Sequence, residues 1–257
     1  MKPSITFLFG LVVWVLAPMA SAHAATFSVH PIKIDLSTKR KSELFAVRNT
    51  GHERLRFQIT VHEWKQSRTG EVELAPTEDI VFYPRMLTLQ GGEERNIRVG
   101  LARTFVSSAA KVKKEKTYRI IVEELPSHTP KAAGPQVRVL TKMSVPIFVS
   151  PEEAIAKPKM IPGGLKAGKF SFQLKNNGNA HTIVRDLKIK GLGKGKRPLF
   201  GKELQGWYLL ADGVRDYDVD LPRRACGKVK TLQVEGRAGD EVFSIDYPLS
   251  EGACAPR

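Results

Sequence analysis

The six histidines are the first residues to consider for metal binding or proton transfer, because imidazole serves both roles near neutral pH. They occur singly along the chain, at His23, His30, His52, His62, His128 and His181. No two are four residues apart, the spacing that puts two imidazoles on one face of a helix in zinc proteases. The segment HEW at residues 62–64 lacks the second histidine of that motif. The sequence therefore predicts ordinary strand and loop histidines and no metal site.

A glycine-rich segment, GGLKAGKF at residues 163–170, comes close to a phosphate-binding loop. Gly163, Gly168 and Lys169 have the required spacing. However, Phe170 stands where such a loop carries the Ser or Thr that holds magnesium, and no helical pattern follows. The sequence therefore predicts no nucleotide site.

Paired carboxylates and nucleophiles are the remaining signs of catalysis. Glu123 and Glu124 are adjacent in a strand pattern, so their carboxylates point to opposite faces of a sheet. The sequence has no Gly-x-Ser-x-Gly segment of the kind that carries a nucleophilic serine. We therefore expect no enzyme, no cofactor and no small-molecule substrate.

The first 24 residues have the pattern of a secretory signal peptide. Lys2 precedes an apolar run of 13 residues, and small residues then occur at Ala-x-Ala spacing. Cleavage after Ala22 or after Ala24 fits this pattern equally well. The apolar run is shorter than the roughly 20 residues of a membrane-spanning helix. We therefore expect an exported protein.

The two cysteines and the basic charge are interpreted in that context. Cys226 and Cys254 form an even pair, which predicts one disulfide in an oxidising compartment. The formal net charge is +15 and is spread along the chain. An exported protein rarely meets nucleic acid, so we expect no nucleic-acid partner. The charge instead favours encounters with acidic protein partners or envelope surfaces.

Strand patterns fill most of the chain. Seven short segments rich in Val, Ile, Phe and Thr precede residue 150, and glycine-containing turns such as Thr50-Gly51 separate several of them. This pattern predicts an antiparallel sandwich of the immunoglobulin type over residues 25–149. Residues 150–158 contain prolines and charges and are predicted to be a linker. Six further strand patterns predict a smaller β-sandwich over residues 159–257.

Two long segments of the first predicted domain lack a strand pattern. Residues 103–117 are polar and basic, and residues 126–136 are rich in Pro, Ala and Gly. We expect both to be surface loops.

The segment VRVLTKMSVPIFV at residues 137–149 alternates apolar and polar side chains. One phase contains Val137, Val139, Thr141, Met143 and Val145, whereas the other begins with Arg138 and Leu140. This alternation predicts a β-strand with one apolar face. The strand either closes its own sheet or lends that face to another protein, and the alternation alone favours the first reading.

Several motifs together resemble the periplasmic chaperones of the chaperone–usher pathway, which assemble pili on Gram-negative bacteria. They are HPIKIDL, AVRNTG, VFYPRMLTLQGGEERNIRV, YRIIVEELP, VRVLTKMSVPIFVSP and LKNNGNAHTIVRDL. The resemblance covers nearly all of the chain after the leader and is strongest to the archaic or alternative branch. It implies an all-β protein with two immunoglobulin-like domains set at an angle around a cleft. It also implies a periplasmic protein without catalysis, whose partners are pilus subunits and an outer-membrane usher.

The resemblance also assigns roles to particular residues. The apolar phase of the last strand of domain 1 would fill the open groove of a pilus subunit through Val137, Val139, Thr141, Met143 and Val145. Lys33 matches a basic residue that holds the subunit's terminal carboxylate. Pro146 occupies the position of the usual second lysine, and Lys142 is the nearest alternative, four residues away.

Two questions stay open at the level of sequence. A structural or adhesive envelope protein built from two sandwiches would show the same strand patterns, and it should self-associate. The free chaperone, in turn, is either a monomer or a homodimer that caps its own exposed strand.

Overall fold

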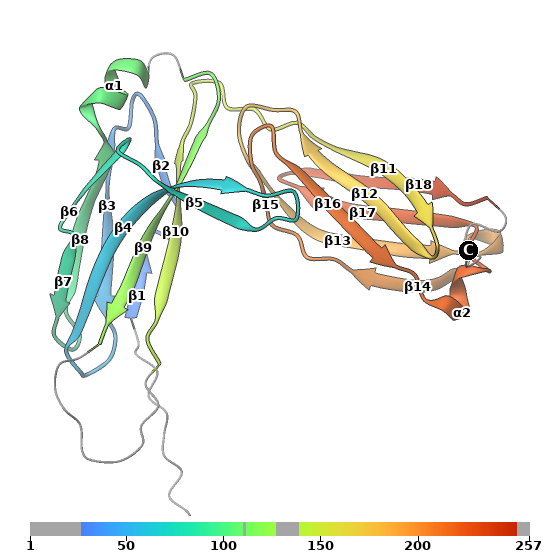
Figure 1. Ribbon diagram of the computed structural model, residues 1–257, viewed down its shortest axis with the longest axis horizontal. Helices are drawn as coiled ribbons and strands as arrows, with labels where there is room; N and C mark the ends of the chain where they lie inside the picture. The colour runs from blue at the N-terminus through green and yellow to red at the C-terminus, as the bar shows by residue number, and fades with distance from the viewer. Residues whose placement is uncertain (1–26, 110–111, 127–138, 251–257) are drawn as a thin grey trace, which may run out of the picture.

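A computed structural model describes residues 27–109, 112–126 and 139–250, which form two β-sandwich lobes set at an angle (Figure 1). β10 ends the first lobe at Val149, and β11 begins the second lobe at Pro158. The predicted fold class, an all-β protein of two sandwiches, is confirmed. Within the described residues, no helix has the length and apolar character needed to cross a membrane.

The first lobe consists of two sheets packed face to face. One sheet has the order β1-β3-β8-β6, and the other has the order β2-β10-β9-β4-β5 with β7 also paired to β4. The strands are β1 (Phe27–His30), β2 (Ile34–Leu36), β3 (Ser42–Asn49), β4 (Leu55–Gln66), β5 (Val72–Pro76), β6 (Ile80–Tyr83), β7 (Met86–Leu89), β8 (Glu94–Leu101), β9 (Lys116–Leu125) and β10 (Lys142–Val149).

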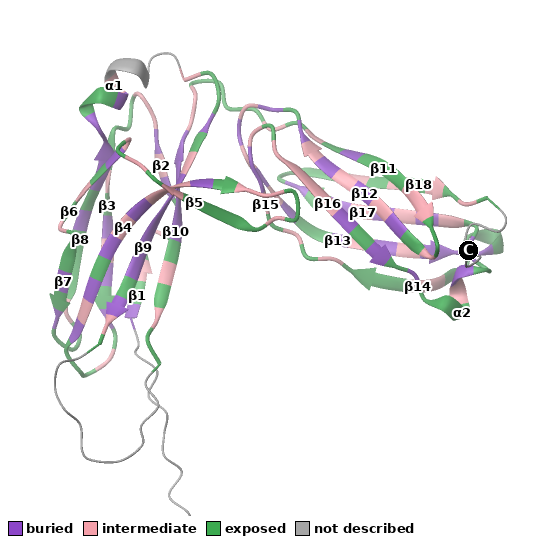
Figure 2. Cartoon of the chain, viewed as in Figure 1, coloured by how far each residue is buried: buried purple, intermediate pink, exposed green. Residues whose placement is uncertain are grey.

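The core of the first lobe follows from the alternation of its strands. In β4, every second residue from Leu55 to Val61 is buried, and those between them are not. β3 alternates in the same way from Phe45 to Asn49, whereas five consecutive residues are buried in both β9 and β10 (Figure 2). Side chains from the inner faces of the two sheets interdigitate, as is usual for aligned sandwiches.

The segment 103–117 differs from the predicted loop. Its first part is the helix α1 (Arg103–Ala109), and β9 begins at Lys116. Phe105 is 5% exposed, and both Phe105 and Val106 pack against the core of the first lobe. Two apolar side chains in a polar segment were enough to dock a short helix, so the prediction of a loop was wrong for these residues. The other predicted loop, residues 126–136, lies almost entirely outside the described residues.

The second lobe is also a sandwich, with sheets β11-β12-β16 and β14-β13-β17-β18, to which β15 adds by pairing with β13. Its elements are β11 (Pro158–Lys166), β12 (Lys169–Asn176), β13 (Thr182–Leu192), the 3-10 turn η1 (Lys194–Lys196), β14 (Pro198–Glu203), β15 (Tyr208–Leu209), β16 (Val214–Asp220), α2 (Arg223–Cys226), β17 (Thr231–Ala238) and β18 (Glu241–Pro248).

The two lobes share one local feature, a buried asparagine at the end of a strand. Asn49 in VRNTG and Asn176 in LKNNGN are both fully buried. The Oδ1 atom of each accepts a hydrogen bond of 3.0 Å from the backbone N–H two residues later, at Gly51 and Gly178. Each amide nitrogen also donates to backbone carbonyls distant in sequence, that of Leu89 for Asn49 and those of Leu209 and Leu210 for Asn176. A buried asparagine therefore ties the same kind of strand end in both sandwiches.

The lobes are joined by more than the linker. Trp64 and Phe148 of the first lobe form a buried cluster with Leu210 of the second. The β4–β5 hairpin reaches the second lobe, where Arg68 makes two hydrogen bonds, of 2.8 and 3.0 Å, to the carboxylate of Asp216. These contacts fix the end of β10 against the second lobe.

Candidate functional site

The outer edge of β10 is open over half of its length. β10 pairs with β9 along its whole length, from Lys142 opposite Glu123 to Val149 opposite Lys116. On the other side, β2 pairs with it only from Ile147 to Val149. Among the described residues, the edge from Lys142 to Pro146 therefore has no strand partner. Such an edge presents unpaired backbone groups to which an extended chain can add as a further strand.

The side chains of β10 divide between the two faces of the sheet. Val145, Ile147 and Val149 are at most 5% exposed and lie in the core of the first lobe, and Met143 packs against that core. The prediction that Val145 fills a partner's groove is therefore wrong, because this side chain already completes the protein's own sandwich. Met143 marks the position at which the strand enters that sandwich.

The residues just before β10 are exposed. Val139 is 59% exposed and Leu140 is 41% exposed, whereas Thr141 is half-buried. The backbone N–H of Glu124 donates to the carbonyl of Thr141 over 3.0 Å, so the chain already runs beside β9 here. Val139 and Thr141 lie on the same side of the chain as Met143 and Val145. They precede the point at which that side of the strand reaches the core. Val137 lies outside the described residues.

The structure does not bring together the two lysines that were predicted to hold a carboxylate. Lys33 precedes β2, level with Pro146, and its ammonium is 2.9 Å from the carboxylate of Asp35. Lys142 pairs with Glu123 over 3.0 Å on the exposed start of β10. Four residues of strand separate Lys142 from Pro146, which is about 13 Å. Lys142 therefore lies at a different level of the sheet from Lys33.

Arg119 is the cation that the sequence analysis missed. It lies directly opposite Pro146 in the β9–β10 ladder, and only 6% of it is exposed. Its guanidinium stacks on Trp64 at 4.0 Å from the ring centroid, and its Nη1 donates to the hydroxyl of Ser144 over 3.2 Å. Its Nε and Nη2 atoms are buried without a hydrogen-bond partner among the described residues.

Arg119 keeps its charge in this setting. Burial lowers the pKa of the guanidinium from its ordinary value, but that value is so high that the group stays protonated at neutral pH. A buried cation with unpaired N–H groups is costly unless an acceptor satisfies them. A carboxylate is the acceptor that best matches the planar guanidinium.

Lys33 and Arg119 occupy one level of the sheet, on either side of Pro146. The core-facing residues Ile34 and Ile120 are fully buried. Lys33 and Arg119, their neighbours along the chain, therefore point to the opposite face. Two strand spacings separate them, which is about 10 Å between backbones. A carboxylate beside Pro146 could therefore be approached by both cations.

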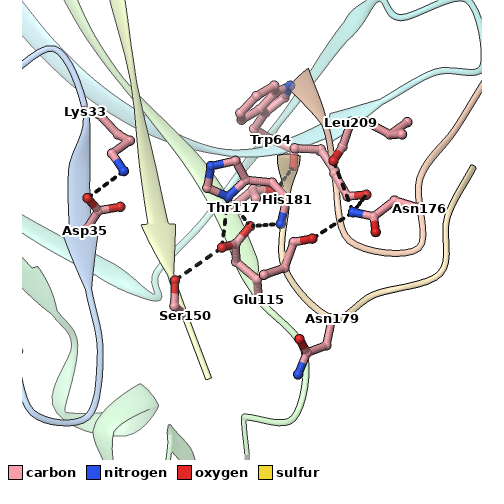
Figure 3. Close-up of polar contacts among 12 residues, drawn as sticks. Lys33, Asp35, Trp64, Glu115, Thr117, Ser150, Asn176, Asn179, His181 and Leu209 are labelled. Carbon is pink, nitrogen blue, oxygen red and sulfur yellow. Dashed lines mark hydrogen bonds and ion pairs between the residues drawn. The ribbon is translucent and has the colours of Figure 1, made fainter. Parts of the chain in front are cut away.

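A buried polar contact holds the end of β10 in place (Figure 3). The side chain of Glu115 is 1% exposed, and Nδ1 of His181 lies 2.8 and 3.0 Å from its two oxygens. The hydroxyl of Ser150 donates to the same carboxylate over 3.2 Å. The imidazole of His181 also stacks on Phe148 at 3.6 Å. Glu115 therefore links β9, the residue after β10 and the second lobe.

Cys226 lies in the second lobe, away from this site. Cys226 is 5% exposed and belongs to the core of the second lobe. Cys254 lies outside the described residues, so the disulfide stays a prediction. In the part of the chain that the structure describes, no group of His, Cys, Asp and Glu side chains is arranged to hold a metal ion.

Comparisons with known proteins identify a family for this chain. A model of the pili and flagellar-assembly chaperone family, for the PapD N-terminal domain, matches residues 26–154. No curated protein matches the chain.

Several solved structures share the fold. One is a chain of the CsuC–CsuE chaperone–tip adhesion subunit pre-assembly complex from archaic chaperone-usher Csu pili of Acinetobacter baumannii, with a TM-score of 0.57, 22% identity, and coverage of 86% of this chain and 98% of that one. The class 5 fimbriae chaperone CfaA has a TM-score of 0.54 at 18% identity, covering 87% of this chain and 100% of its own. The Pseudomonas aeruginosa CupB2 chaperone has a TM-score of 0.56 at 10% identity, with the same coverage. At these identities, the solved structures establish the fold alone.

Proposed function

The chain belongs to the family of pili and flagellar-assembly chaperones, and from this premise we propose that it binds pilus subunits by lending them a β-strand. This family assembles pili and is not a family of enzymes. The donated segment begins before β10, at Val137 and Val139, and continues along the open edge to Pro146. A subunit that lacks one strand of its own sandwich would pair its backbone with this edge.

The observation that carries the proposal is the open edge of β10 together with the exposed apolar residues that lead into it. Val139 is 59% exposed and lies just before the part of β10 whose side chains enter the core of the first lobe. An exposed apolar strand edge invites aggregation unless a partner covers it. Strand addition supplies main-chain hydrogen bonds for affinity and side-chain pockets for specificity.

Arg119 and Lys33 would hold the end of the subunit. Both cations flank Pro146, and the buried Nε and Nη2 atoms of Arg119 need an acceptor. A terminal carboxylate placed there would satisfy them with charge-assisted hydrogen bonds. It would also fix the register of the added strand, because a terminal carboxylate held beside Pro146 allows the subunit's strand only one position along β10.

Two structural neighbours support pilus subunits as the partners. One is a complex of a chaperone with a tip adhesion subunit, and another contains the SafA pilin with the SafB chaperone. Family membership implies an exported protein. We extend the proposal to the periplasm as its location, with residues 1–24 as a removable leader, and to an outer-membrane usher as the acceptor of each subunit. We also propose that two free copies can cover each other's open edge.

Hydrogen exchange tests the proposal directly. Those backbone amides of residues 139–145 that point away from β9 should exchange rapidly in the free protein and become protected when a pilus subunit from the same gene cluster is bound. The edge strand β18 in the second lobe serves as the internal control and should not change. Formation of a stable complex with no new protection at residues 139–145 would contradict strand donation.

A further inference from the structure

The end of the second lobe that lies farthest from the first lobe carries three loops beside the end of β18 (Figure 1). They are the turn between β11 and β12, the loop that contains η1, and the segment from Asp220 through α2 to Lys230. The amide of Leu221 donates to the carbonyl of Gly168, and the amide of Lys230 donates to the carbonyl of Leu192. These bonds tie the three loops into one surface, which we call the basic tip (residues 166–169, 193–197 and 220–230).

The first two loops of the basic tip carry five exposed cations. Lys166 and Lys169 flank the turn between β11 and β12, and Lys194, Lys196 and Arg197 follow β13. Gly168 and Gly195 adopt positive φ values, of 76° and 67°, which allow the chain to reverse sharply and present these side chains outwards.

The third loop adds Arg223, Arg224, Lys228 and Lys230, all exposed. Asp220 is the one acidic residue in the three loops. Apart from Lys230, the cations of the basic tip form no ion pair with any described residue. Outside the basic tip, residues 158–250 contain eight basic and nine acidic side chains. The positive charge of the second lobe is therefore concentrated at this end.

The basic tip has no apolar anchor. The large exposed apolar side chains of the second lobe are Ile161, Trp207 and Val242, and none lies in the three loops. Stable protein interfaces usually centre on such anchors, and single-stranded nucleic acid needs aromatic platforms. Unpaired lysines on separate loops fit instead a broad anionic surface that makes no shape-specific demand.

We propose that the basic tip binds the anionic lipid headgroups of a membrane surface. Family membership implies export into a compartment bounded by membranes, and the tip is at the opposite end of the molecule from the open edge of β10 (Figure 1). The contact is peripheral and electrostatic, since no apolar side chain is placed to insert. It holds the protein at a membrane while leaving the first lobe free, and it does not depend on strand donation.

Vesicle co-sedimentation tests this contact with the full chain. The probes are vesicles of equal parts phosphatidylglycerol and phosphatidylcholine, compared with vesicles of phosphatidylcholine alone. The test variant replaces one cation in each loop, by Lys166→Glu, Lys194→Glu and Arg224→Glu. The matched control makes the same change in net charge elsewhere in the second lobe, by Lys159→Glu, Arg185→Glu and Lys202→Glu, none of which has an ion-pair partner among the described residues.

The unchanged protein should bind only the anionic vesicles and should be released at about 0.5 M salt, where the Debye length falls to a few ångströms. The test variant should bind more weakly by more than about tenfold, and the control should change by less than threefold or so. Equal loss in both variants would mean that net charge alone is responsible, and it would overturn the proposal. Absence of binding by the unchanged protein, as expected if the partner is an acidic protein, would overturn it as well.

Lysine acetylation of the unchanged protein provides a second readout that does not depend on any variant folding. Lys194, Lys196 and Lys228 should be shielded by anionic vesicles, whereas Lys159 and Lys202 should react as they do in free solution. Uniform reactivity of all five lysines in the presence of bound vesicles would contradict the assignment to the basic tip.

Discussion

Arg119 lies directly across the β9–β10 ladder from Pro146, and its guanidinium is buried with two nitrogen atoms unpaired among the described residues. Proline offers no charge at the position where the sequence resemblance places a lysine. The structure therefore has a cation at the same level of the sheet, but on the neighbouring strand. This arrangement would give the proposed carboxylate site a donor with two fixed N–H directions in place of a flexible ammonium.

Arg119→Met should weaken capture of a pilus subunit by roughly tenfold to a hundredfold, the effect of losing a hydrogen bond to a charged group. The thermal midpoint of the free protein should change little or rise, because a half-satisfied buried cation is removed. Subunit capture in pull-down and thermal unfolding are measured for the same preparation. Arg98→Met is the control, since Arg98 is an exposed cation on β8, in the other sheet of the first lobe. Equal capture by the Arg119 variant and the unchanged protein would exclude Arg119 as an anchor.

Lys33 shares its charge with Asp35, so two substitutions beside β2 should act in opposite directions. Lys33→Ala should reduce subunit capture, whereas Asp35→Asn should maintain or raise it by freeing the ammonium for a carboxylate. Both side chains of this ion pair are exposed. Because exposed ion pairs contribute little to stability, neither change should shift the melting temperature by more than a few degrees. If Asp35→Asn lowers capture as much as Lys33→Ala does, the two residues act as a structural pair and Lys33 is not an anchor.

Much of the fold could be predicted from sequence because alternation is a local signal. The strands of both lobes appear as short runs rich in Val, Ile and Phe, and burial follows the period of two in β4 and β12. The helix α1 was missed because its docking depends on two side chains, Phe105 and Val106, which a polar surrounding sequence obscures. Local patterns therefore gave the sandwiches but not every connection between strands.

The candidate site was harder to predict because it depends on register and on where the sandwich ends. The alternation from Val137 to Val145 does not show that Met143 is the first residue to reach the core. Likewise, nothing local pairs Arg119 with Pro146, which are 27 residues apart in sequence. The one signal for Arg119 was a charge inside the apolar run TYRIIV, which indicates a cation held at a buried position.

Replacement by Asp should destabilise the protein at Val145 but not at Val139. Val145→Asp puts a carboxylate into the core of the first lobe, where an unpaired charge costs several kcal/mol, so the lobe should unfold or melt at much lower temperature. Val139→Asp alters an exposed side chain and should leave the melting temperature nearly unchanged. Thermal unfolding followed by circular dichroism compares the two variants. Equal destabilisation would show that the strand enters the sandwich earlier than Met143.

The predicted disulfide between Cys226 and Cys254 is tested by counting thiols. Denatured protein that has not been reduced should contain close to zero free thiols, and reduction should release two. In the chain-entropy model the disulfide, which closes a loop of this length, stabilises the folded state by roughly 3–4 kcal/mol, so the reduced protein should melt at lower temperature. Two reactive thiols before reduction would contradict the pairing.

The central claim is that the segment leading into β10 enters the fold of a pilus subunit, and the most direct measurement is subunit capture by Val139→Asp against Val81→Asp. The two valines have similar exposure, 59% and 54%, but Val81 lies on β6 in the other sheet. Both variants should fold. Val139→Asp should lose capture by orders of magnitude, because its charge would enter a dry groove, whereas Val81→Asp should capture the subunit as the unchanged protein does. Full capture by the folded Val139→Asp variant would contradict strand donation from this segment.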